Sequence, residues 1–358
     1  MSYTLPIGPY HPALEEPYKI ELDCEGEIVR DARIQIGFNF RAIELLAEQR
    51  NYTQNIALFE RVCGICSNVH TLTYCMAIEN LAAIEVPRRA QFIRVIVAEL
   101  ERLHSHMLWA GAAAHIMGFQ TLFMTCFYLR EKVMDILEAV SGNRVNYAMN
   151  CVGGVNRDIE DIAAIRAMTK SIETAVGEQL IPIFTKDKTV LARCAGVGVL
   201  TRQDAIAWGA LGPTARASGV AQDIRQDDPY AAYSELEFEP IVQTDGDVLA
   251  RIVVRAREIV ESCRIIQQAL DKMPAGAWKG SPFVEVPSGE AVARIEAPRG
   301  EVFYYIASDG SDKPRRVKVR TPSFMNMPTV RLMMKNATLA DAPLIQASID
   351  PCYSCTDR

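Results

Sequence analysis

Residues 87–103 read PRRAQFIRVIVAELERL, and this stretch decides the predicted fold class. After Pro87, apolar side chains recur at positions 92, 93, 96, 97, 100 and 103, a spacing typical of a core-facing helix. A second long helix is predicted after residues 244–247, TDGD, which have the character of a capping box. Working outward from these two helices, we predict a helical core over residues 40–275.

Both ends of the chain predict small β elements instead. Residues 18–22 alternate apolar and polar side chains, and a turn at 25–27 leads into a second strand at 28–29. Near the other end, residues 302–306 and 317–320 have the β-branched and aromatic content of strands. The expected fold is therefore mainly α with small β elements at both ends (α+β). It is a single domain over residues 1–358, with a β-rich segment at 1–38 and a β-containing segment at 290–358.

Composition excludes some functions. The formal net charge of −6 gives no basic surface for nucleic acid. Residues 107–129 contain no Asp, Glu, Lys or Arg and are long enough to span a bilayer. They also contain His115, Gln120 and several small residues, so we interpret them as a pair of buried core helices. The first residues have neither a cationic start nor an apolar segment, and we expect no secretory leader.

Four of the ten cysteines form two Cys-X-X-Cys pairs, Cys63 with Cys66 and Cys352 with Cys355. Two intervening residues let both sulfurs of a pair reach one metal, and four thiolates suit zinc, nickel, copper(I) or iron–sulfur chemistry. A structural zinc site is the commonest use of such pairs, but here 352 − 66 = 286 positions separate them. The cysteines alone also allow a thioredoxin-like dithiol, or two pairs that never meet in space.

The residues around the pairs narrow these possibilities. Residues 61–66, RVCGIC, and 350–355, DPCYSC, resemble the two cysteine motifs of nickel–iron hydrogenase large subunits. The block from residue 101 to 155 also resembles the related large subunit of respiratory complex I, which generally lacks the cysteines. Residues 11–14, HPAL, and the final Arg358 look most like the energy-converting, ferredoxin-linked hydrogenases.

The resemblance implies a cofactor of one nickel and one iron, with carbon monoxide and cyanide on the iron. It makes Cys63 and Cys352 terminal nickel ligands, while Cys66 and Cys355 bridge nickel and iron. The implied reaction is the reversible heterolytic cleavage of dihydrogen.

Other site residues follow from the same resemblance. Residues 296–300, EAPRG, resemble the segment that places an arginine, here Arg299, over the metals. Because a guanidinium stays protonated, we favour the Cys352 thiolate as first proton acceptor and give Arg299 the role of stabilising the anionic cluster. Glu16, with Glu15 as the alternative, matches the glutamate that relays the proton outward.

Three further assignments complete the expected site. Ser323 matches the hydroxyl that hydrogen-bonds an iron cyanide, and Asp350 is expected to brace Arg299 or the second cysteine motif. Glu44 matches a glutamate that binds magnesium or iron, a role that suits a carboxylate. Most relatives place a histidine ligand for that ion where this chain has Arg358, which offers a metal no lone pair.

The sequence has no third cysteine group for an iron–sulfur cluster, so electrons must pass to another polypeptide. The implied partners are a small subunit with a four-iron four-sulfur cluster, integral-membrane ion-translocating subunits and ferredoxin. Dihydrogen and protons are the substrates, and the place is the cytoplasmic peripheral arm of a membrane complex. The alternative function is a complex-I-like, non-hydrogenase subunit that keeps a structural zinc at the four cysteines.

Overall fold

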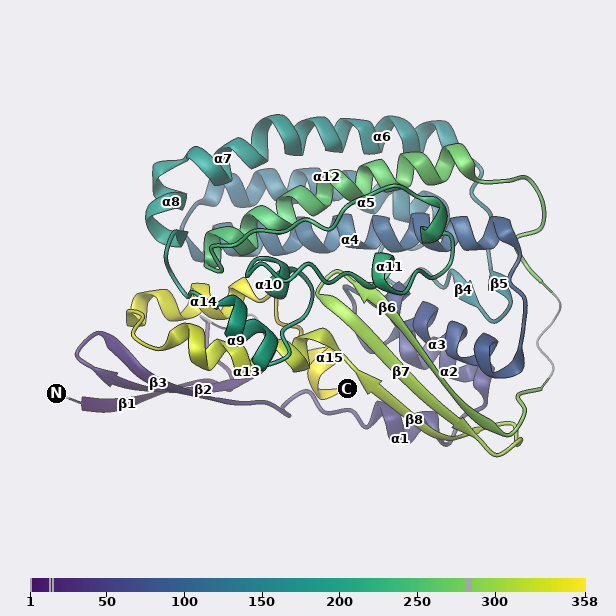
Figure 1. Cartoon of the computed structure of the whole chain (residues 1–358), viewed down its shortest axis with the longest axis horizontal. Coiled ribbons are helices and arrows are strands. Elements are labelled where there is room, and N and C mark those ends of the chain that lie inside the picture. Colours follow the sequence, from purple (N-terminus) through teal and green to yellow (C-terminus); the bar gives the residue numbers. More distant parts are fainter. Residues whose placement is uncertain (1, 13, 15, 281–284) are drawn as a thin grey trace.

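The computed structural model describes residues 2–12, 14, 16–280 and 285–358. Long helices form one side of the molecule, and two three-stranded sheets lie on the other, at opposite ends (Figure 1). The helices are α1 Ile43–Ala47, α2 Tyr52–Glu60, α3 Ser67–Ala82, α4 Arg88–Ile116, α5 Gln120–Ser141, α6 Ile162–Ala175, α7 Ile181–Lys186, α8 Lys188–Cys194, α9 Arg202–Ala207, α10 Gly212–Arg216, α11 Ile224–Asp227, α12 Val248–Lys272, α13 Pro322–Met334, α14 Ala342–Ser348 and α15 Tyr353–Asp357. Short π and 3₁₀ segments lie at Val176–Leu180 (η1), Tyr233–Glu235 (η2) and Leu339–Asp341 (η3).

The two larger sheets are antiparallel and built from neighbouring strands. The first is β1 Ser2–Ile7, β2 Lys19–Glu25 and β3 Ile28–Gln35, and the second is β6 Gly289–Ala297, β7 Gly300–Ser308 and β8 Pro314–Arg320. A two-stranded ribbon pairs β4 Asn150–Cys151 with β5 Gly154–Val155. In the second sheet Ala297 pairs with Gly300, so Pro298 and Arg299 form a two-residue hairpin turn.

The helical layer is organised around α4, which packs against α5 and α12. Its residues from 92 to 107 are all buried, as expected for a helix covered on several faces. Asp247 caps α12 by accepting the N–H of Ala250. One continuous apolar core includes all four cysteines of the two pairs and side chains from both larger sheets.

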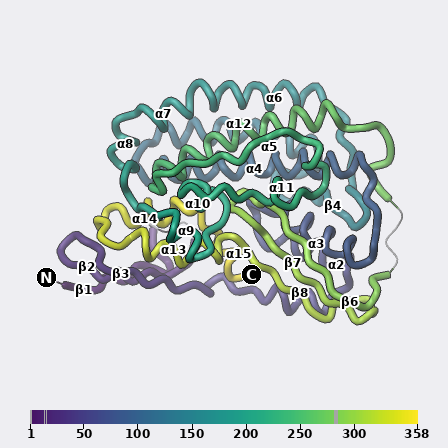
Figure 2. Tube along the Cα trace, in the orientation of Figure 1, coloured from purple at the N-terminus to yellow at the C-terminus, as the bar shows by residue number. Residues whose placement is uncertain are grey.

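This arrangement brings the distant cysteine pairs together. Cys66 immediately precedes α3, and Cys352 immediately precedes α15. The tube trace shows α15, in yellow, next to β7 and below the helical layer (Figure 2). Two short loops, each ending at the first turn of a helix, therefore meet in the interior.

The mainly helical fold with β elements at both ends is confirmed. The charge-free residues 107–129 form the end of α4 and the start of α5, as predicted for a helix pair. The prediction that both helices are buried is wrong for the start of α5, where Met124 and Tyr128 are exposed, because only one face of that helix packs against α4. Among the described residues no helix is long and apolar enough to cross a membrane. Strands β1 and β6 were not predicted, and α12 begins at Val248 with a simple Asp247 cap, because position 250 is an alanine that cannot complete a capping box.

Candidate metal centre

The four paired cysteines converge on one buried point. The Sγ atom of Cys63 lies 3.4 Å from that of Cys352, and the Sγ atom of Cys66 lies 3.3 Å from that of Cys355. Cys352 and Cys355 are themselves 3.3 Å apart, and all four side chains are at most 3% exposed. These separations are far longer than a disulfide bond, and all four are free cysteines.

The local backbone directs these sulfurs. The N–H groups of Ile65 and Cys66 both donate to Sγ of Cys63, at 3.2 and 3.3 Å. Hydrogen bonds from Cys352, and to a smaller extent from Cys355, lower the pKa of Cys63 well below its ordinary value. On the other loop, Asp350 adopts a left-handed backbone, with φ of 56°, that turns the chain into the second pair.

A cation is required for all four sulfurs to be thiolates. Two unit charges 3.4 Å apart repel by about 5 kcal/mol at an effective dielectric constant of 20. Burial adds a desolvation penalty to each charge. Soft thiolates with this spacing match a soft transition metal, so the donor set fits the nickel and iron that the resemblance implies.

Arg299 supplies a fixed positive charge beside the cysteines. Its Nε and Nη2 donate to the main-chain O and the Oδ1 of Asp350, each at 2.8 Å, and both side chains are buried. Although burial alone would lower it, Asp350 and the cysteine thiolates raise the pKa of Arg299 well above its ordinary value. The hairpin turn that carries Arg299 packs closely on Gly212, where a Cβ atom would lie 2.5 Å from the main-chain O of Arg299. The guanidinium is therefore held rigidly and stays charged.

A small cavity adjoins two of the thiols. Its polar side chains are Arg299, Ser323 and His70, and it is lined by Cys66, His70, Ala297, Pro298, Arg299, Val302, Pro322, Ser323 and Cys355. Ser323 Oγ accepts the N–H of Cys352 at 3.1 Å, which leaves its own proton available as a donor. Such a wall suits small diatomic ligands on a metal held by Cys66 and Cys355, with hydrogen-bond donors on one side.

Glu16 lies beside the second cysteine loop. Its Oε2 accepts the N–H groups of Tyr353 and Ser354, at 2.7 and 3.1 Å, in the first turn of α15. Burial, together with the negative charge of Cys63, raises the pKa of Glu16. Glu15, the alternative in the sequence, lies outside the described residues.

His70 and Tyr304 also lie beside the cluster. His70 Nε2 lies 3.4 Å from Sγ of Cys355, and its Nδ1 lies 2.8 Å from the hydroxyl of Tyr304. Burial lowers the pKa of His70 to about 4, so the imidazole is neutral at physiological pH. The four-residue spacing from Cys66 to His70, one turn of α3, is the sequence signal for this contact, and Tyr304 gave none.

Glu101 on α4 is a further buried acid behind the first cysteine loop. Its two carboxylate oxygens accept the N–H groups of Asn68 and Val69, at 2.7 and 3.0 Å, in the first turn of α3. Burial raises the pKa of Glu101 to about 8. His104 and His106 face different partners, Ile65 O and Glu258, as expected for helical positions two residues apart.

The surroundings of Glu44 do not fit a hard cation. Its Oε1 accepts Nε of Arg358 at 2.9 Å and the N–H of Val319 at 3.1 Å, while its Oε2 accepts Nζ of Lys318 at 2.9 Å. Although desolvation alone would raise it, hydrogen bonds from Lys318 and Arg358 lower the pKa of Glu44. Two cations already neutralise the one carboxylate, so a magnesium or iron ion would be repelled rather than coordinated.

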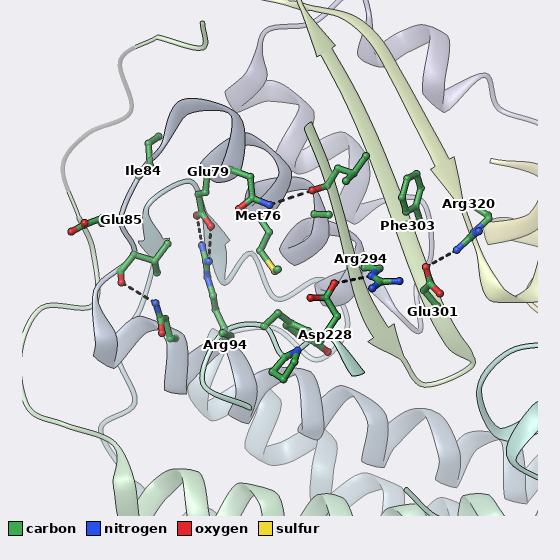
Figure 3. A pocket seen from close by; sticks show the side chains of 18 residues that line it. Met76, Glu79, Ile84, Glu85, Arg94, Asp228, Arg294, Glu301, Phe303 and Arg320 are labelled. Atoms are coloured by element: carbon green, nitrogen blue, oxygen red, sulfur yellow. Dashed lines mark hydrogen bonds and ion pairs between the residues drawn. The ribbon is translucent and has the colours of Figure 1, made fainter. Parts of the chain in front are cut away.

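A pocket of about 1050 Å³ lies at the opposite end of α3 (Figure 3). Six of its charged side chains form three mutual pairs: Arg94 with Glu79, Arg294 with Asp228 and Arg320 with Glu301. None of the four paired cysteines lines it. We therefore assign no chemistry to this pocket.

Comparison with known proteins relates the chain to subunits of hydrogenases and of respiratory complexes. The family model "Respiratory-chain NADH dehydrogenase, 49 Kd subunit" matches residues 117–283 and 281–358, and the model "Nickel-dependent hydrogenase" matches residues 41–110. The chain is 44% identical to a carbon monoxide-induced hydrogenase of Rhodospirillum rubrum, over 100% of this chain and 99% of the relative. It is 42% identical to the membrane-bound hydrogenase subunit alpha of Pyrococcus furiosus, over 99% of this chain and 87% of the relative.

Other relatives carry different names. The chain is 39% identical to a subunit of the NADH-quinone oxidoreductase of Dehalococcoides mccartyi, over 100% of this chain and 98% of the relative. A chain from the solved structure of the membrane-bound sulfane sulfur reductase, an archaeal respiratory membrane complex, superimposes with a TM-score of 0.94 at 35% identity, covering 100% of this chain and 98% of that one.

Fold and thiol cluster together define a large subunit of the type shared by hydrogenases and respiratory complexes. The chain belongs to the family that unites nickel–iron hydrogenase large subunits with the 49 kDa subunit of respiratory NADH dehydrogenase.

Proposed function

We propose that this chain is the catalytic large subunit of an energy-converting nickel–iron hydrogenase. The observation that carries the proposal is the convergence of four buried cysteines beside the Arg299–Asp350 pair. Cys63 and Cys352 would be terminal nickel ligands, and Cys66 and Cys355 would bridge nickel and iron. When bound, the two metals supply the acceptor for hydride in the heterolytic cleavage of dihydrogen.

The chain itself handles the proton. Cys352 is the proposed first acceptor, because it is the terminal thiol whose following residue, Tyr353, donates its N–H to Glu16. The raised pKa of Glu16 lets its carboxyl hold a proton closer to neutral pH. Arg299 cannot accept that proton, since its guanidinium remains charged, and it stabilises the anionic cluster instead.

Glu16 also lines a small cavity. The side chains of Tyr18, Gln346 and Tyr353 contribute to the wall of this cavity. The Oε1 atom of Gln346 is buried and has no hydrogen-bond partner in the structure, so the wall contains an unused acceptor. A polar cavity of this kind suits a water molecule that carries the proton away from Glu16.

The electrons released at the metals must pass to a further cofactor, separately from the proton. Within the described part of the chain, one group of three or more potential metal ligands is found, and it belongs to the cysteine cluster. We therefore infer a small subunit with a four-iron four-sulfur cluster, and ferredoxin as its electron partner. The relatives named as subunits of membrane-bound enzymes support a place in the cytoplasmic arm of a complex with ion-translocating membrane subunits.

A second function has its own support. The 49 kDa subunit model matches more of the chain than the hydrogenase model does, and a quinone oxidoreductase subunit is among the relatives. Under this alternative the chain is a non-hydrogenase subunit of a respiratory complex, and the four cysteines hold a structural zinc.

Metal content and infrared spectra of the purified complex separate the two functions. Nickel and iron in equal amounts, with bands of metal-bound carbon monoxide and cyanide, support the hydrogenase, whereas zinc alone contradicts it. The matched variants are Cys352→Ser and Cys126→Ser, because Cys126 is equally buried but lies on α5 outside the cluster. We expect Cys352→Ser to abolish dihydrogen-driven dye reduction and Cys126→Ser to retain it; survival of activity in Cys352→Ser would overturn the proposal.

A further inference from the structure

Two buried rings connect a strand of the C-terminal sheet to one cysteine of the cluster. The Tyr304 hydroxyl on β7 lies 2.8 Å from Nδ1 of His70, and Nε2 of His70 lies 3.4 Å from Sγ of Cys355. Both rings are completely buried. Each nitrogen of the imidazole therefore has one defined neighbour, and water does not compete for either.

An imidazole with a single ring proton has two possible forms between these two partners. One ring nitrogen carries a proton and the other carries a lone pair. If Nδ1 is protonated, the lone pair of Nε2 faces the sulfur, which repels it when Cys355 is a thiolate. If Nε2 is protonated, it donates to the sulfur, and Nδ1 is free to accept the hydroxyl proton of Tyr304. The second form satisfies all three groups.

We propose that Tyr304 is a positioning residue whose hydroxyl donates to Nδ1 of His70 and thereby holds Nε2–H toward the sulfur of Cys355. For its effect on the metals, the inference rests on the proposed hydrogenase function, in which Cys355 bridges nickel and iron. A hydrogen bond to a ligating sulfur withdraws charge from the metal centre and raises its reduction potential.

Tyr304 is well fixed for this purpose. On β7 it pairs with Ala293 of β6 and Val319 of β8, so its backbone lies in the centre of the sheet. The ring of Phe59 meets it edge-on, with centroids 5.2 Å apart. The hydroxyl therefore reaches His70 from a rigid element, and a change to phenylalanine removes the donor while keeping the ring contacts.

The first test reads the tautomer directly in the chain loaded with zinc, a diamagnetic ion that keeps Cys355 a thiolate and does not require the nickel–iron centre. In the full chain with ¹⁵N-labelled histidine, His70 is assigned by the signal lost in His70→Gln. We expect the wild type to show the Nε2–H tautomer and Tyr304→Phe to show a mixture. The matched control is Tyr74→Phe, because Tyr74 is also buried, packs on the same Phe59 ring and donates instead to Tyr52 O.

Tyr74→Phe should leave the His70 tautomer unchanged. An Nδ1–H tautomer in the wild type would overturn the inference even if Tyr304→Phe fails to fold, and so would an unchanged tautomer in a folded Tyr304→Phe.

The second test uses the complex with its metals. We expect Tyr304→Phe to move the carbon monoxide and cyanide bands to lower wavenumber and to shift a redox equilibrium of the centre by about fivefold to tenfold. A tenfold shift corresponds to about 59 mV for a one-electron couple. In a His70→Ala background, Tyr304→Phe should add nothing, whereas equal shifts with and without His70 would contradict the inference. If the wild type lacks these bands altogether, the hydrogenase function fails, and the tautomer still decides the role of Tyr304.

Discussion

Replacing Glu16 by glutamine tests the proton exit without disturbing its surroundings. Glu16 Oε2 accepts two backbone N–H groups, from Tyr353 and Ser354. A glutamine amide oxygen can accept both, so the second cysteine loop should keep its position. The group that is lost is the carboxyl that carries a proton. A positioned acid–base group contributes about 10²- to 10⁴-fold to rate, or about 2.7 to 5.4 kcal/mol of the activation barrier.

The assay is dihydrogen-driven dye reduction, normalised to nickel content, with the infrared bands as a check on the metal centre. We expect Glu16→Gln to lose at least about a hundredfold in rate while its nickel content and bands stay those of the wild type. The control is Glu60→Gln, because Glu60 is a buried carboxylate that accepts the N–H of Ala148 without facing the thiols. If Glu16→Gln kept a rate within about threefold of the wild type, the proton would have to leave by another path.

Three further predictions concern stability and the accessory cation. Because burial raises the pKa of Glu101 to about 8, its folded state binds a proton that the unfolded state releases near pH 4.5. The free energy of unfolding should therefore fall as pH rises between these values, by at most about 1.4 kcal/mol per unit; Glu101→Gln should remove this slope, and an unchanged slope in thermal unfolding would contradict the assignment. Asp350→Asn leaves the Arg299 guanidinium buried without its counter-charge and should cost about 3–5 kcal/mol in urea unfolding, whereas Asp31→Asn, at an exposed pair, should cost about 1 kcal/mol or less; equal costs would refute this reasoning. Since Arg358 already neutralises Glu44, the purified complex should contain no stoichiometric magnesium and should keep its activity in a chelator, while Arg358→His should gain magnesium; a magnesium ion in the wild type would be the contrary result.

Local patterns predicted the elements of this fold well. The helical period around α4 and the charge-free stretch that follows it both correspond to helices in the structure. Strand β6 was not predicted because polarity does not follow burial along Gly289–Ala297: the apolar Val292 is exposed, whereas the charged Glu296 is buried. The exact start of helix α6 at Ile162 is set by Asp161, whose side chain caps the helix. Such boundaries depend on single side-chain hydrogen bonds, which a periodic pattern does not contain.

The candidate site could be predicted only where a local motif marked it. The two Cys-X-X-Cys pairs and Arg299 carry signals within a few residues, but only the family resemblance, and no local pattern, predicts that segments 286 positions apart close into one cluster. Tyr304 lies on a strand whose pattern of aromatic and β-branched residues reports sheet packing, not a hydroxyl directed at His70. Arg358 could be recognised as an unusual residue for a cation site, whereas its pairing with Glu44 is a tertiary contact over 314 positions.

The fold cannot by itself choose between the proposed function and its alternative, because hydrogenases and quinone-linked subunits share it over the full length of this chain. The charges around the cluster provide the discriminating argument. Four buried thiolates carry four negative charges. The positive charge of Arg299 is neutralised by its ion pair with Asp350. A single divalent zinc would bring the sum to −2, but it would use neither the cavity beside Cys66 and Cys355 nor the donors of Arg299 and Ser323 that line it. Two metals, one of them carrying small anionic ligands that accept hydrogen bonds, account for the thiols, the cavity and the donors together.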